Sequence, residues 1–406
     1  MSTDNNADAL RDASLISNPK KVVLGMQHTF TMFGATVLVP LITGLDISVT
    51  LLMAGIGTLL FHFITKKKVP VFLGSSFAFI APILAVAGMS DLAHAQGGIV
   101  VAGLMYLVLA GLIYAFGVEN VIKYFPPVIT GPIIIVIGLK LAPVAIDMAS
   151  ADWLLATVAF IIVLIVTIYT KGFIKVIPVI IGLIGGYLVA LMMGKVDFSS
   201  VASADWFGLP NFTIAKFSIT AVMTVAPVAL ATMVEHIGDV LAISATVEKD
   251  FLKDPGLHRT LIGDGVATSV SAMFGGPANT TYSENTGVLA LTRVFDPVIM
   301  RIAAVFAIFL GLIPKMSALI STIPVGVIGG ISIILFGMIA AIGVRTLVER
   351  AVDFTKSRNL LIAAVIFVLG LGGAVLPIKF AQVDFTIEGM ALAAIIGIIL
   401  NIILPE

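Results

Sequence analysis

The residues of this chain best suited to chemistry are a few ionisable side chains inside strongly apolar sequence. They are His28, Glu235, His236, Asp239, Asp264 and Glu284. Glu235 and Asp239 are four residues apart and would share one face of a helix. An ionisable group at membrane depth is costly and is a functional candidate by default. Carboxylates around one cavity are good proton acceptors, because neighbouring like charges favour protonation of one of them.

Some of these residues also have a structural interpretation. Asp239 and Asp264 lie near the predicted ends of apolar segments and would then face water. His28 would only hydrogen-bond a neighbouring helix, and His62 and His236 would be packing or interface residues. Glu235 and Glu284 are the hardest to explain in this way, because each lies inside a predicted span.

Two apolar segments open with stretches that are too polar and too rich in small residues for lipid-facing helices. The first runs from Pro70 to Ala78 and the second from Gly275 to Ser283. Each is predicted to form a short extended stretch followed by a half-helix. Such backbone is tolerated at membrane depth only where protein or a wet cavity covers it. The second half-helix is predicted over Ser283–Thr292, with Glu284 in its first turn.

A cavity between these stretches would be rich in hydrogen-bond acceptors. It would offer two carboxylates, Asn279, Thr280 and exposed backbone. Phe77 and Tyr282 flank it and could pack on a ring face. Such a cavity disfavours a free anion and suits a flat neutral molecule with N–H donors beside carbonyl acceptors. A uracil-like base meets this description.

The composition indicates a polytopic membrane protein. Of the 406 residues, 59% are hydrophobic and 11% are charged, with 23 basic and 23 acidic residues. A soluble domain carries about 25% charged residues, so this chain could not cover a water-facing surface with polar groups. A cytosolic enzyme, a secreted module, a nucleic-acid binder and a disordered chain are excluded. The lack of cysteine excludes disulfides and thiolate-bound metals, and we expect no cofactor or metal.

Fourteen candidate spans follow a polar N-terminal tail, 1–19, which lacks the features of a cleavable signal. A spanning helix needs about 20 mainly apolar residues. The candidates lie near 21–43, 48–64, 70–88, 97–117, 124–142, 152–170, 173–193, 214–244, 258–275, 277–292, 297–313, 317–344, 357–376 and 386–404. With a cytoplasmic N-terminus, 18 of the 23 Lys and Arg residues fall on the inner side. This positive-inside bias predicts that both termini are cytoplasmic.

Two features recur about 200 positions apart and indicate an inverted repeat. Gly131 and Gly138 in span 5 correspond to Gly330 and Gly337 in span 12, and the polar openings of spans 3 and 10 correspond to each other. Both pairs are seven spans apart, which is an odd number, so the two halves have opposite orientations. Inverted repeats with broken helices in matching positions are typical of secondary transporters, whose substrate binds where the broken helices meet. The alternative is the weak self-similarity of any apolar sequence.

Several motifs resemble those of the nucleobase–ascorbate transporters. The stretch from Glu284 to Arg293 (ENTGVLALTR) resembles the family signature, and Gln27-His28 resembles its paired residues in span 1. The stretches 73–80, 235–238 and 254–259 resemble those of bacterial uracil permeases. The resemblance runs from about residue 20 to the end of the chain.

The resemblance implies an all-α polytopic membrane protein of 14 segments in two inverted seven-segment repeats, with short antiparallel strands in segments 3 and 10. A core domain would comprise 20–118 (segments 1–4) and 213–315 (segments 8–11). A gate domain would comprise 119–212 (segments 5–7) and 316–406 (segments 12–14). It further implies uracil import by proton symport across the plasma membrane, here the bacterial inner membrane. A homodimer through the gate domains is also implied, in contact with membrane lipid.

The resemblance also implies roles for individual residues. Glu235 and Glu284 would bind uracil through hydrogen bonds, and the backbone near Phe77 and Ser283 would bind its other edge. The substrate-binding set is Glu235, Glu284, Phe77, Ser76, Tyr282, Ser283 and Ala78. The proton-coupling set is Glu235, Glu284, Asp239 and His28. The supporting set is Gln27, Asn279, Thr280 and Asn285.

One departure from the family pattern bears on ion coupling. Asp239 stands four residues after Glu235, where uracil permeases can carry a histidine linked to proton coupling. Both side chains titrate, but they differ in charge when protonated, so sequence leaves the choice between H⁺ and Na⁺ open. Two alternative functions also stay open: an anion carrier or channel of the sulfate or bicarbonate type on the same fold, and a purine (xanthine or urate) symporter. An ATP-driven pump or intramembrane enzyme is disfavoured, since the chain has neither a phosphate-binding loop nor an H-E-x-x-H motif.

Overall fold

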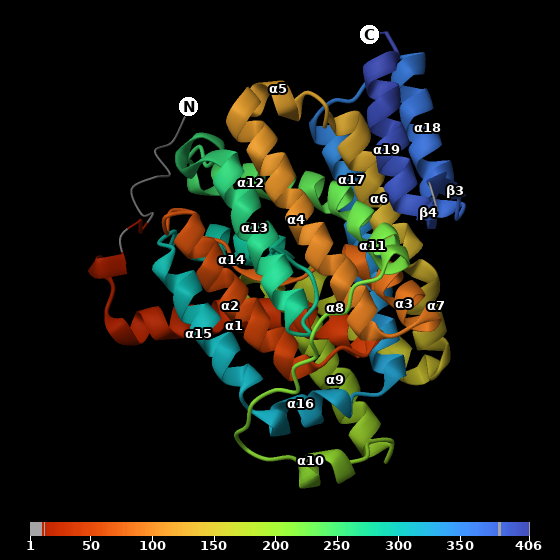
Figure 1. The fold of residues 1–406 in the computed structure, drawn as a ribbon. Helices are drawn as coiled ribbons and strands as arrows, with labels where there is room; N and C mark the ends of the chain where they lie inside the picture. Colours follow the sequence, from red (N-terminus) through yellow and green to blue (C-terminus); the bar gives the residue numbers. More distant parts are fainter. Residues whose placement is uncertain (1–9, 12, 381–382, 406) are drawn as a thin grey trace.

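The computed structural model describes residues 10–11, 13–380 and 383–405. Most of these residues are helical, and two short antiparallel strand pairs complete the described structure (Figure 1). Of the predicted tail 1–19, residues 1–9 and 12 lie outside the described part.

The first half of the chain contains long apolar helices and several short connecting helices. They are α1 (Asn18–Thr43), α2 (Ile47–Ile64), α3 (Ile80–Met89), α4 (Leu92–Phe116), α5 (Val118–Ile122), α6 (Pro127–Lys140), α7 (Ala142–Ser150), α8 (Trp153–Tyr169), α9 (Pro178–Met192) and α10 (Ser199–Ser203). Three of them begin at an aspartate that accepts a backbone N–H: Asp46 before α2, Asp91 before α4 and Asp152 before α8. These caps satisfy donors that a helix leaves free at its N-terminus.

The second half has a comparable set of helices. They are α11 (Ile219–Val225), α12 (Ala229–Val247), α13 (Leu257–Met273), α14 (Ser283–Thr292), α15 (Val298–Gly311), α16 (Pro314–Ser321), α17 (Val325–Glu349), α18 (Ser357–Leu371) and α19 (Gly389–Ile403). Shorter helical turns are η1 (Ala13–Leu15), η2 (Phe77–Phe79), η3 (Gly172–Val176), η4 (Ala226–Val228) and η5 (Leu252–Gly256).

Within the described residues, six helical stretches are long and apolar enough to cross a membrane. A seventh arises if α15 and α16, which are bent by 80° relative to each other, count as one span. The largely helical fold class is confirmed, whereas the number of fourteen segments stays a prediction. The predicted segment 317–344 is wrong at its start, because residues 317–321 belong to α16 and α17 begins at Val325. Pro324 lies between the two helices and lacks the N–H that continuation of a helix would need.

The two polar openings form a pair of antiparallel strands, as the sequence predicts. In strands β1 (Leu73–Ser75) and β2 (Asn279–Thr281), Leu73 pairs with Thr281, Gly74 with Thr280 and Ser75 with Asn279. β1 leads through η2 into α3. β2 leads into α14, which has the predicted bounds of the second half-helix.

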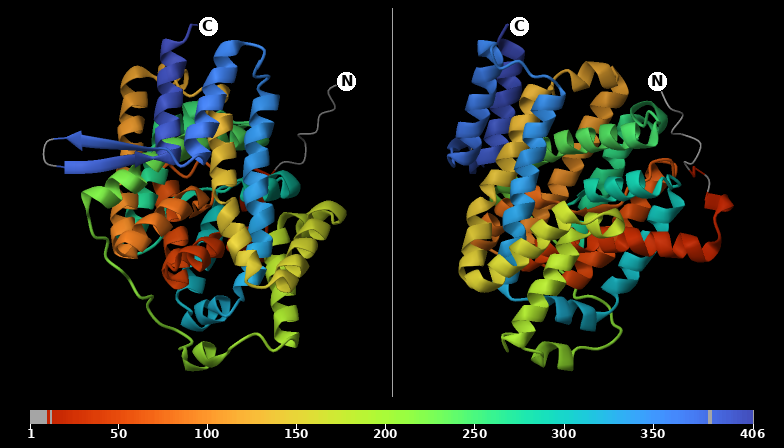
Figure 2. Two further views of the ribbon diagram at one scale, coloured as in Figure 1. Left: turned by 90° about the vertical axis from the view of Figure 1, so that its right-hand side faces the viewer. Right: turned by 180° about the vertical axis from the view of Figure 1, so that it is seen from behind.

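A second strand pair lies between the last two predicted spans, 357–376 and 386–404, and overlaps the ends of both. β3 (Val375–Phe380) and β4 (Val383–Glu388) pair antiparallel between α18 and α19. Figure 2 shows this hairpin projecting sideways from the helices, and β4 lies against α11. β4 (VDFTIE) has the strict alternation of apolar and polar residues that is typical of a strand, and the sequence analysis missed this signal.

Glycines let the helices of the interior approach each other closely. An added Cβ on Gly343 of α17 would lie 2.7 Å from the carbonyl oxygen of Gly131 on α6. Gly131 faces Leu347 and Gly138 faces Ala340, so α6 and α17 run antiparallel. Gly103 on α4 and Gly265 on α13 make a comparable contact, with an added Cβ at either position 2.5 Å from the carbonyl oxygen of the other. Small residues at such contacts are the usual way that helices pack in membranes.

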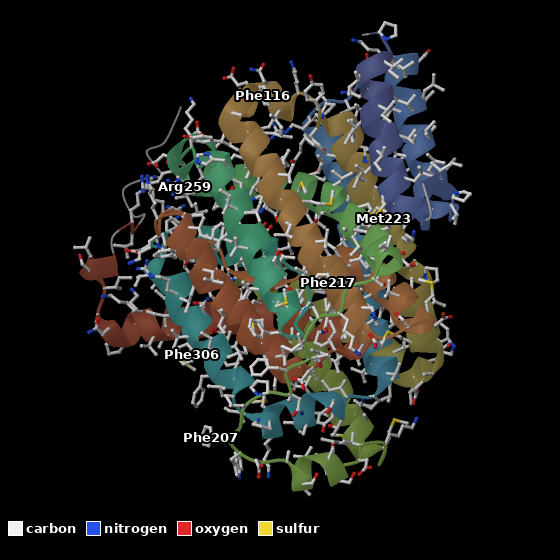
Figure 3. The ribbon with its side chains drawn as sticks, viewed as in Figure 1. Phe116, Phe207, Phe217, Met223, Arg259 and Phe306 are labelled. Carbon is white, nitrogen blue, oxygen red and sulfur yellow. The ribbon has the colours of Figure 1, made fainter. Side chains whose placement is uncertain are left out.

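The outer surface is strongly apolar. The side chains of Phe116, Phe207 and Phe217 are 64%, 68% and 55% exposed, and they lie well apart in Figure 3. Exposed aromatic and aliphatic side chains spread over many helices are expected where lipid rather than water surrounds the protein.

Candidate functional site

The candidate site is built around the crossing of β1 and β2. Two further backbone bonds extend the pairing: Ser76 donates its N–H to the carbonyl of Ala278 (2.9 Å), and Tyr282 donates its N–H to that of Phe72 (3.2 Å). On its other side, Leu73 donates its N–H to the hydroxyl oxygen of Thr58 on α2 (2.9 Å). The crossing therefore has its backbone groups paired although it lies inside the helical body.

Tyr282 fixes the two arms of the crossing to each other. Its hydroxyl donates to the carbonyl of Ser75 (3.0 Å), and the Ser75 hydroxyl donates to the carbonyl of Thr36 on α1 (3.1 Å). The ring of Tyr282 lies where a Cβ on Gly74 would be. Position 74 therefore requires a glycine, because any larger side chain would overlap the ring of Tyr282.

The acids of α12 reach the crossing from one side. The Thr281 hydroxyl donates to Oδ2 of Asp239 (2.6 Å), so the side chain of β2 binds the carboxylate directly. Glu235 lies one turn earlier on the same helix and is half-buried. Asp264 on α13 and Glu284 on α14 come from two helices that both pack against α12.

Glu284 and Asn285 occupy the first turn of α14. Glu284 is exposed, and the positive end of the helix dipole lies beside it. Asn285 is buried, and its amide nitrogen lies 3.2 Å from Nδ1 of His28 and donates to the His28 carbonyl (3.4 Å). His28 on α1 thus contacts the half-helix through Asn285, next to the exposed carboxylate.

Residues 76–78 form the other arm of the site. Phe77 packs edge-to-face on Phe336 of α17, with ring centroids 6.0 Å apart. Ser76 and Ala78 are buried, and the Ser76 hydroxyl has no hydrogen-bond partner among the described residues. This arm offers backbone and ring surface but no charge.

Of the remaining predicted residues, only Asn279 connects the crossing to a neighbouring helix in the described structure. Asn279 is buried and donates its amide to the carbonyl of Ala267 on α13 (3.3 Å). Thr280 is also buried, and its hydroxyl finds no partner in the described structure. Gln27 is half-buried on α1, and its carbonyl accepts from Thr31 (2.9 Å). Ser283 begins α14, and its side chain lies outside the described part.

A cleft adjoins α12 on the face next to Glu235. It has a volume of about 360 Å³ and separates α12 from α6 and α17. Val234, Ile237, Gly238 and Leu241 form the α12 side. Lys123 and Arg350 also line the cleft. None of the residues Glu235, Asp239, Asp264 and Glu284 lines this cleft.

The sequence analysis missed several partners of the predicted residues. Thr281, Ser75 and Thr36 bind Asp239 or Tyr282, and the only signal for them was the polar composition of the two openings. The expectation that Asp264 faces water is wrong. Asp264 is fully buried on α13, with Oδ2 3.0 Å from Nδ1 of His236. Helical spacing places residues on one helix but says nothing about which neighbouring helix they meet.

Among the described residues, no group of three or more His, Asp or Glu side chains has an arrangement that could hold a metal ion.

The comparisons with known sequences agree with each other over nearly the whole chain. The Permease family model matches residues 19–379. The chain is 48% identical to the uracil permease of Bacillus caldolyticus over 95% of this chain and 92% of that protein. It is 39% identical to the uracil permease of Escherichia coli K12 over 94% of this chain and 90% of that protein.

Solved structures of anion transporters share the fold at low sequence identity. The murine Slc26a9 anion transporter in its inward-facing state aligns with a TM-score of 0.71 and 10% identity, over 96% of this chain and 68% of that chain. The transmembrane domain of the cyanobacterial bicarbonate transporter BicA aligns with a TM-score of 0.59 and 13% identity, over 95% of this chain and 98% of that chain. At this identity the likeness concerns the fold alone.

The family match, the identity to full-length relatives and the apolar helices lead to one conclusion. The chain is a multi-pass membrane transporter that belongs to the permease family of nucleobase–ascorbate transporters.

Proposed function

We propose that this protein imports uracil across the bacterial inner membrane together with protons. The observation that carries the proposal is the pairing of β1 with β2. It brings a carboxylate at the start of α14 and two carboxylates of α12 to one crossing inside the helical body. The identity to uracil permeases favours uracil as the substrate.

The two arms of the crossing divide the recognition of a planar base. Glu235 and Glu284 accept hydrogen bonds from its N–H groups, and backbone groups near Phe77 and Ser283 bind its carbonyl edge. Tyr282 contributes its ring rather than its hydroxyl, because that hydroxyl already donates to Ser75. Ser76 and Ala78 shape the pocket through their small size. Hydrogen bonds to carboxylates are the strong ones in such a site.

Proton coupling belongs to the same group of carboxylates. Glu235 and Asp239 lie one turn apart on α12, and α14, which carries Glu284, packs against α12. A proton taken up with uracil relieves the cost of several negative charges in a low-dielectric interior. His28 links α1 to α14 through Asn285, and Asn279 ties β2 to α13. Gln27 and Thr280 complete the proposed supporting set.

The movement that completes transport is a displacement of a core domain (20–118 and 213–315) against a gate domain (119–212 and 316–406). Fourteen segments in two inverted repeats make up these domains. The antiparallel crossing of β1 and β2 and the antiparallel glycine contact of α6 and α17 support the inverted relation. Phe77 and Phe336 then meet across the domain boundary. Such motions are the usual basis of alternating access.

We further propose that both termini are cytoplasmic. Figure 1 shows α5 and the C-terminal end of the chain at one end of the molecule and α10 and α16 at the other. Lys123 follows α5, Arg350 follows the last residue of α17, and Arg358 lies in the first turn of α18. The positive-inside assignment puts all three residues on the cytoplasmic side. A homodimer through the gate domains, surrounded by lipid, completes the proposal.

The direct test is uptake of labelled uracil into proteoliposomes with an imposed proton gradient. We expect uracil to accumulate inside the vesicles when the outside is acidic. A protonophore should abolish the uptake that depends on the proton gradient. A sodium gradient at equal pH serves as the control for coupling to Na⁺. Accumulation that follows sodium and ignores pH would contradict proton symport.

A competition panel separates the alternative substrates. Unlabelled uracil should displace labelled uracil more strongly than xanthine or urate, at each of two pH values. Sulfate and bicarbonate should not compete, because Glu284 stands in front of the half-helix terminus that would otherwise attract an anion. Anion currents without uracil would revive the anion-carrier alternative.

A further inference from the structure

Three helices, α1, α9 and α16, leave an apolar cavity between them. The cavity has a volume of about 280 Å³. Its lining side chains are spaced three or four residues apart on each helix, as residues on one helical face are. On α1 and α16 they are Phe30, Phe33, Val37, Met316, Leu319 and Ile320. α9 adds one face of its stretch from Ile180 to Tyr187, so each helix turns an apolar face toward the same space.

The cavity offers little to a polar ligand. Two of its lining side chains carry a polar group, Thr29 and Tyr187, and both hydroxyls already have partners. Thr29 donates to the carbonyl of Gly25 (2.9 Å), and the hydroxyl oxygens of Tyr187 and Thr322 lie 2.7 Å apart. A buried water needs about two to four polar partners, so this cavity suits hydrocarbon rather than water.

The cavity opens onto the apolar outer surface of the molecule. One lining side chain from each of the three helices is exposed: Phe30 on α1, Ile184 on α9 and Leu319 on α16. In a multi-pass membrane protein such a surface meets lipid tails, which are as apolar as the lining. The membrane itself therefore supplies a fitting occupant, an acyl chain.

A basic and an aromatic side chain lie next to the apolar face of α16. Lys315 directly precedes Met316, and its Nζ lies 4.9 Å from the centre of the exposed Trp206 ring. α16 is bent by 80° from α15, and Figure 1 shows it with α10 at one end of the molecule. Lys and Trp are typical of the membrane interface, where lipid headgroups lie. Lys315 is thus placed to attract the phosphate of a lipid whose chain enters the cavity.

The cavity also lies between parts that are proposed to move against each other. Its α1 side belongs to the proposed core domain, and its α9 and α16 sides belong to the proposed gate domain. Thr29 in its wall follows His28, which contacts Asn285 in the first turn of α14. An occupant of the cavity therefore touches the helix that is tied to the half-helix of Glu284.

We propose that an acyl chain of a bilayer phospholipid occupies this cavity, with its headgroup at Lys315. The lipid site itself is independent of the proposed function, whereas its effect on transport rests on the proposed movement of the core domain against the gate domain. A flexible chain keeps the space between the two domains filled and changes shape as they move. A rigid side chain in the same place could not do so.

The test is photo-cross-linking of the full-length protein in phosphatidylcholine vesicles that contain phosphatidylglycerol with a diazirine on its acyl chain. Mass spectrometry of the digested protein locates the cross-links. We expect them to concentrate on the cavity faces of α1, α9 and α16. Val108 and Leu112, which are exposed on α4 outside the cavity, give the background. An even spread over the exposed apolar positions would overturn the proposal.

A variant that fills the cavity sharpens the test. Ile180→Trp places a larger side chain in it from α9 and should remove most cross-links on α1 and α16. Ile165→Trp on α8 is the matched control and should leave them unchanged, because Ile165 is exposed but does not line the cavity. If Ile180→Trp yields no folded protein, Leu319→Trp, which fills the cavity from α16, decides. Undiminished cross-linking in a folded, filled variant would contradict the site.

Lys315→Gln tests the position of the headgroup. Cross-linking by the anionic phosphatidylglycerol label should fall in this variant, because a lysine ammonium attracts net negative charge at the membrane surface. The same diazirine on zwitterionic phosphatidylcholine should cross-link about as well as before. An unchanged yield with the anionic label would overturn the assignment of the headgroup to Lys315.

The effect on transport has a separate measurement. We expect Ile180→Trp to lower the maximal rate of uracil uptake several-fold with uracil affinity unchanged, because the domain movement rather than binding is hindered. An unchanged rate, or a loss of affinity together with rate, would contradict this role of the chain. Cross-linking requires no transport. If the unmodified protein fails to accumulate uracil, the proposed function is refuted and the lipid site is still decided by the cross-links.

Discussion

The two arms of the strand crossing have the same backbone plan but different chemistry. In the first arm, β1 is followed by Ser76 and the apolar turn η2, and no ionisable residue occurs between Leu73 and Met89. In the second arm, β2 is followed by α14, whose first turn contains Glu284 and Asn285. The first arm packs on α17 through Phe77, whereas the second binds α12 through Thr281 and α1 through Asn285.

This difference suggests how two similar arms form an asymmetric site. Both arms supply an extended stretch that leads into a helix. Only the second arm supplies an acid, and it contacts the helix that bears Glu235 and Asp239. A base with N–H donors on one edge and carbonyls on the other matches such a pair of unlike arms. Variants of the two arms should therefore have unequal effects.

The largest effect is expected for Glu284→Ala in the second arm. We expect uracil affinity to fall by roughly 100-fold, the value of one hydrogen bond to a charged group, and gradient-driven uptake to disappear. Isothermal titration of purified protein measures the affinity. Glu349→Gln, which removes an exposed carboxylate paired with Arg345, is the control. Unchanged uptake in Glu284→Ala would contradict the assignment of the site.

The next effect is expected for Gly74→Ala in the first arm. An added Cβ would overlap the ring of Tyr282 and lie 2.8 Å from Oγ1 of Thr36. We expect the free energy of unfolding to fall by about 1–3 kcal/mol, as for other overpacked sites, and uracil binding to weaken with it. Thermal unfolding in detergent measures the change.

The matched glycine variant is Gly111→Ala on α4, where an added Cβ meets nothing within 4 Å. It should leave the melting temperature unchanged or raise it slightly, because alanine favours helix over glycine. If Gly74→Ala and Gly111→Ala lower the melting temperature equally, the crossing is not closely packed.

A smaller effect is expected for Thr281→Val, which keeps the shape of the side chain but removes the donor to Asp239. The carboxylate then loses a short hydrogen bond, and uracil affinity should fall by about 10-fold, or 1–2 kcal/mol. Thr246→Val is the control, because that hydroxyl only donates to the carbonyl of Ala242 on its own helix. If the uracil affinity equals that of the unmodified protein, the hydrogen bond from Thr281 to Asp239 does not contribute to uracil binding.

The smallest effect is expected for Ser76→Ala. Its hydroxyl has no partner among the described residues, and we expect the first arm to bind uracil through its backbone. Uracil affinity should change by less than about 3-fold, below the value of one neutral hydrogen bond. A loss as large as that of Thr281→Val would show that side chains of both arms bind the base and would remove the contrast between them.

Several local features of the crossing could be predicted from its residues. The polar openings at 70–78 and 275–283 indicated extended stretches, and the half-helix at Ser283–Thr292 was predicted with its observed bounds. These predictions succeeded because small and polar residues inside apolar sequence leave few alternatives at membrane depth. The β3–β4 hairpin was missed although β4 (VDFTIE) alternates apolar and polar residues as a strand does. The helix α16 was missed because a short apolar helix next to a long one leaves no separate periodic signal.

The amino-acid sequence by itself determined that this protein is a helical membrane transporter, and it singled out the acids Glu235, Asp239 and Glu284. Scarce charge in apolar sequence is a strong signal, because each such charge is costly there. Only the tertiary structure decided which groups those acids meet: Thr281 for Asp239, and Asp264 as the partner of His236. Contacts between residues far apart in the chain depend on how helices pack, and spacing along one helix contains no information about the neighbour it meets.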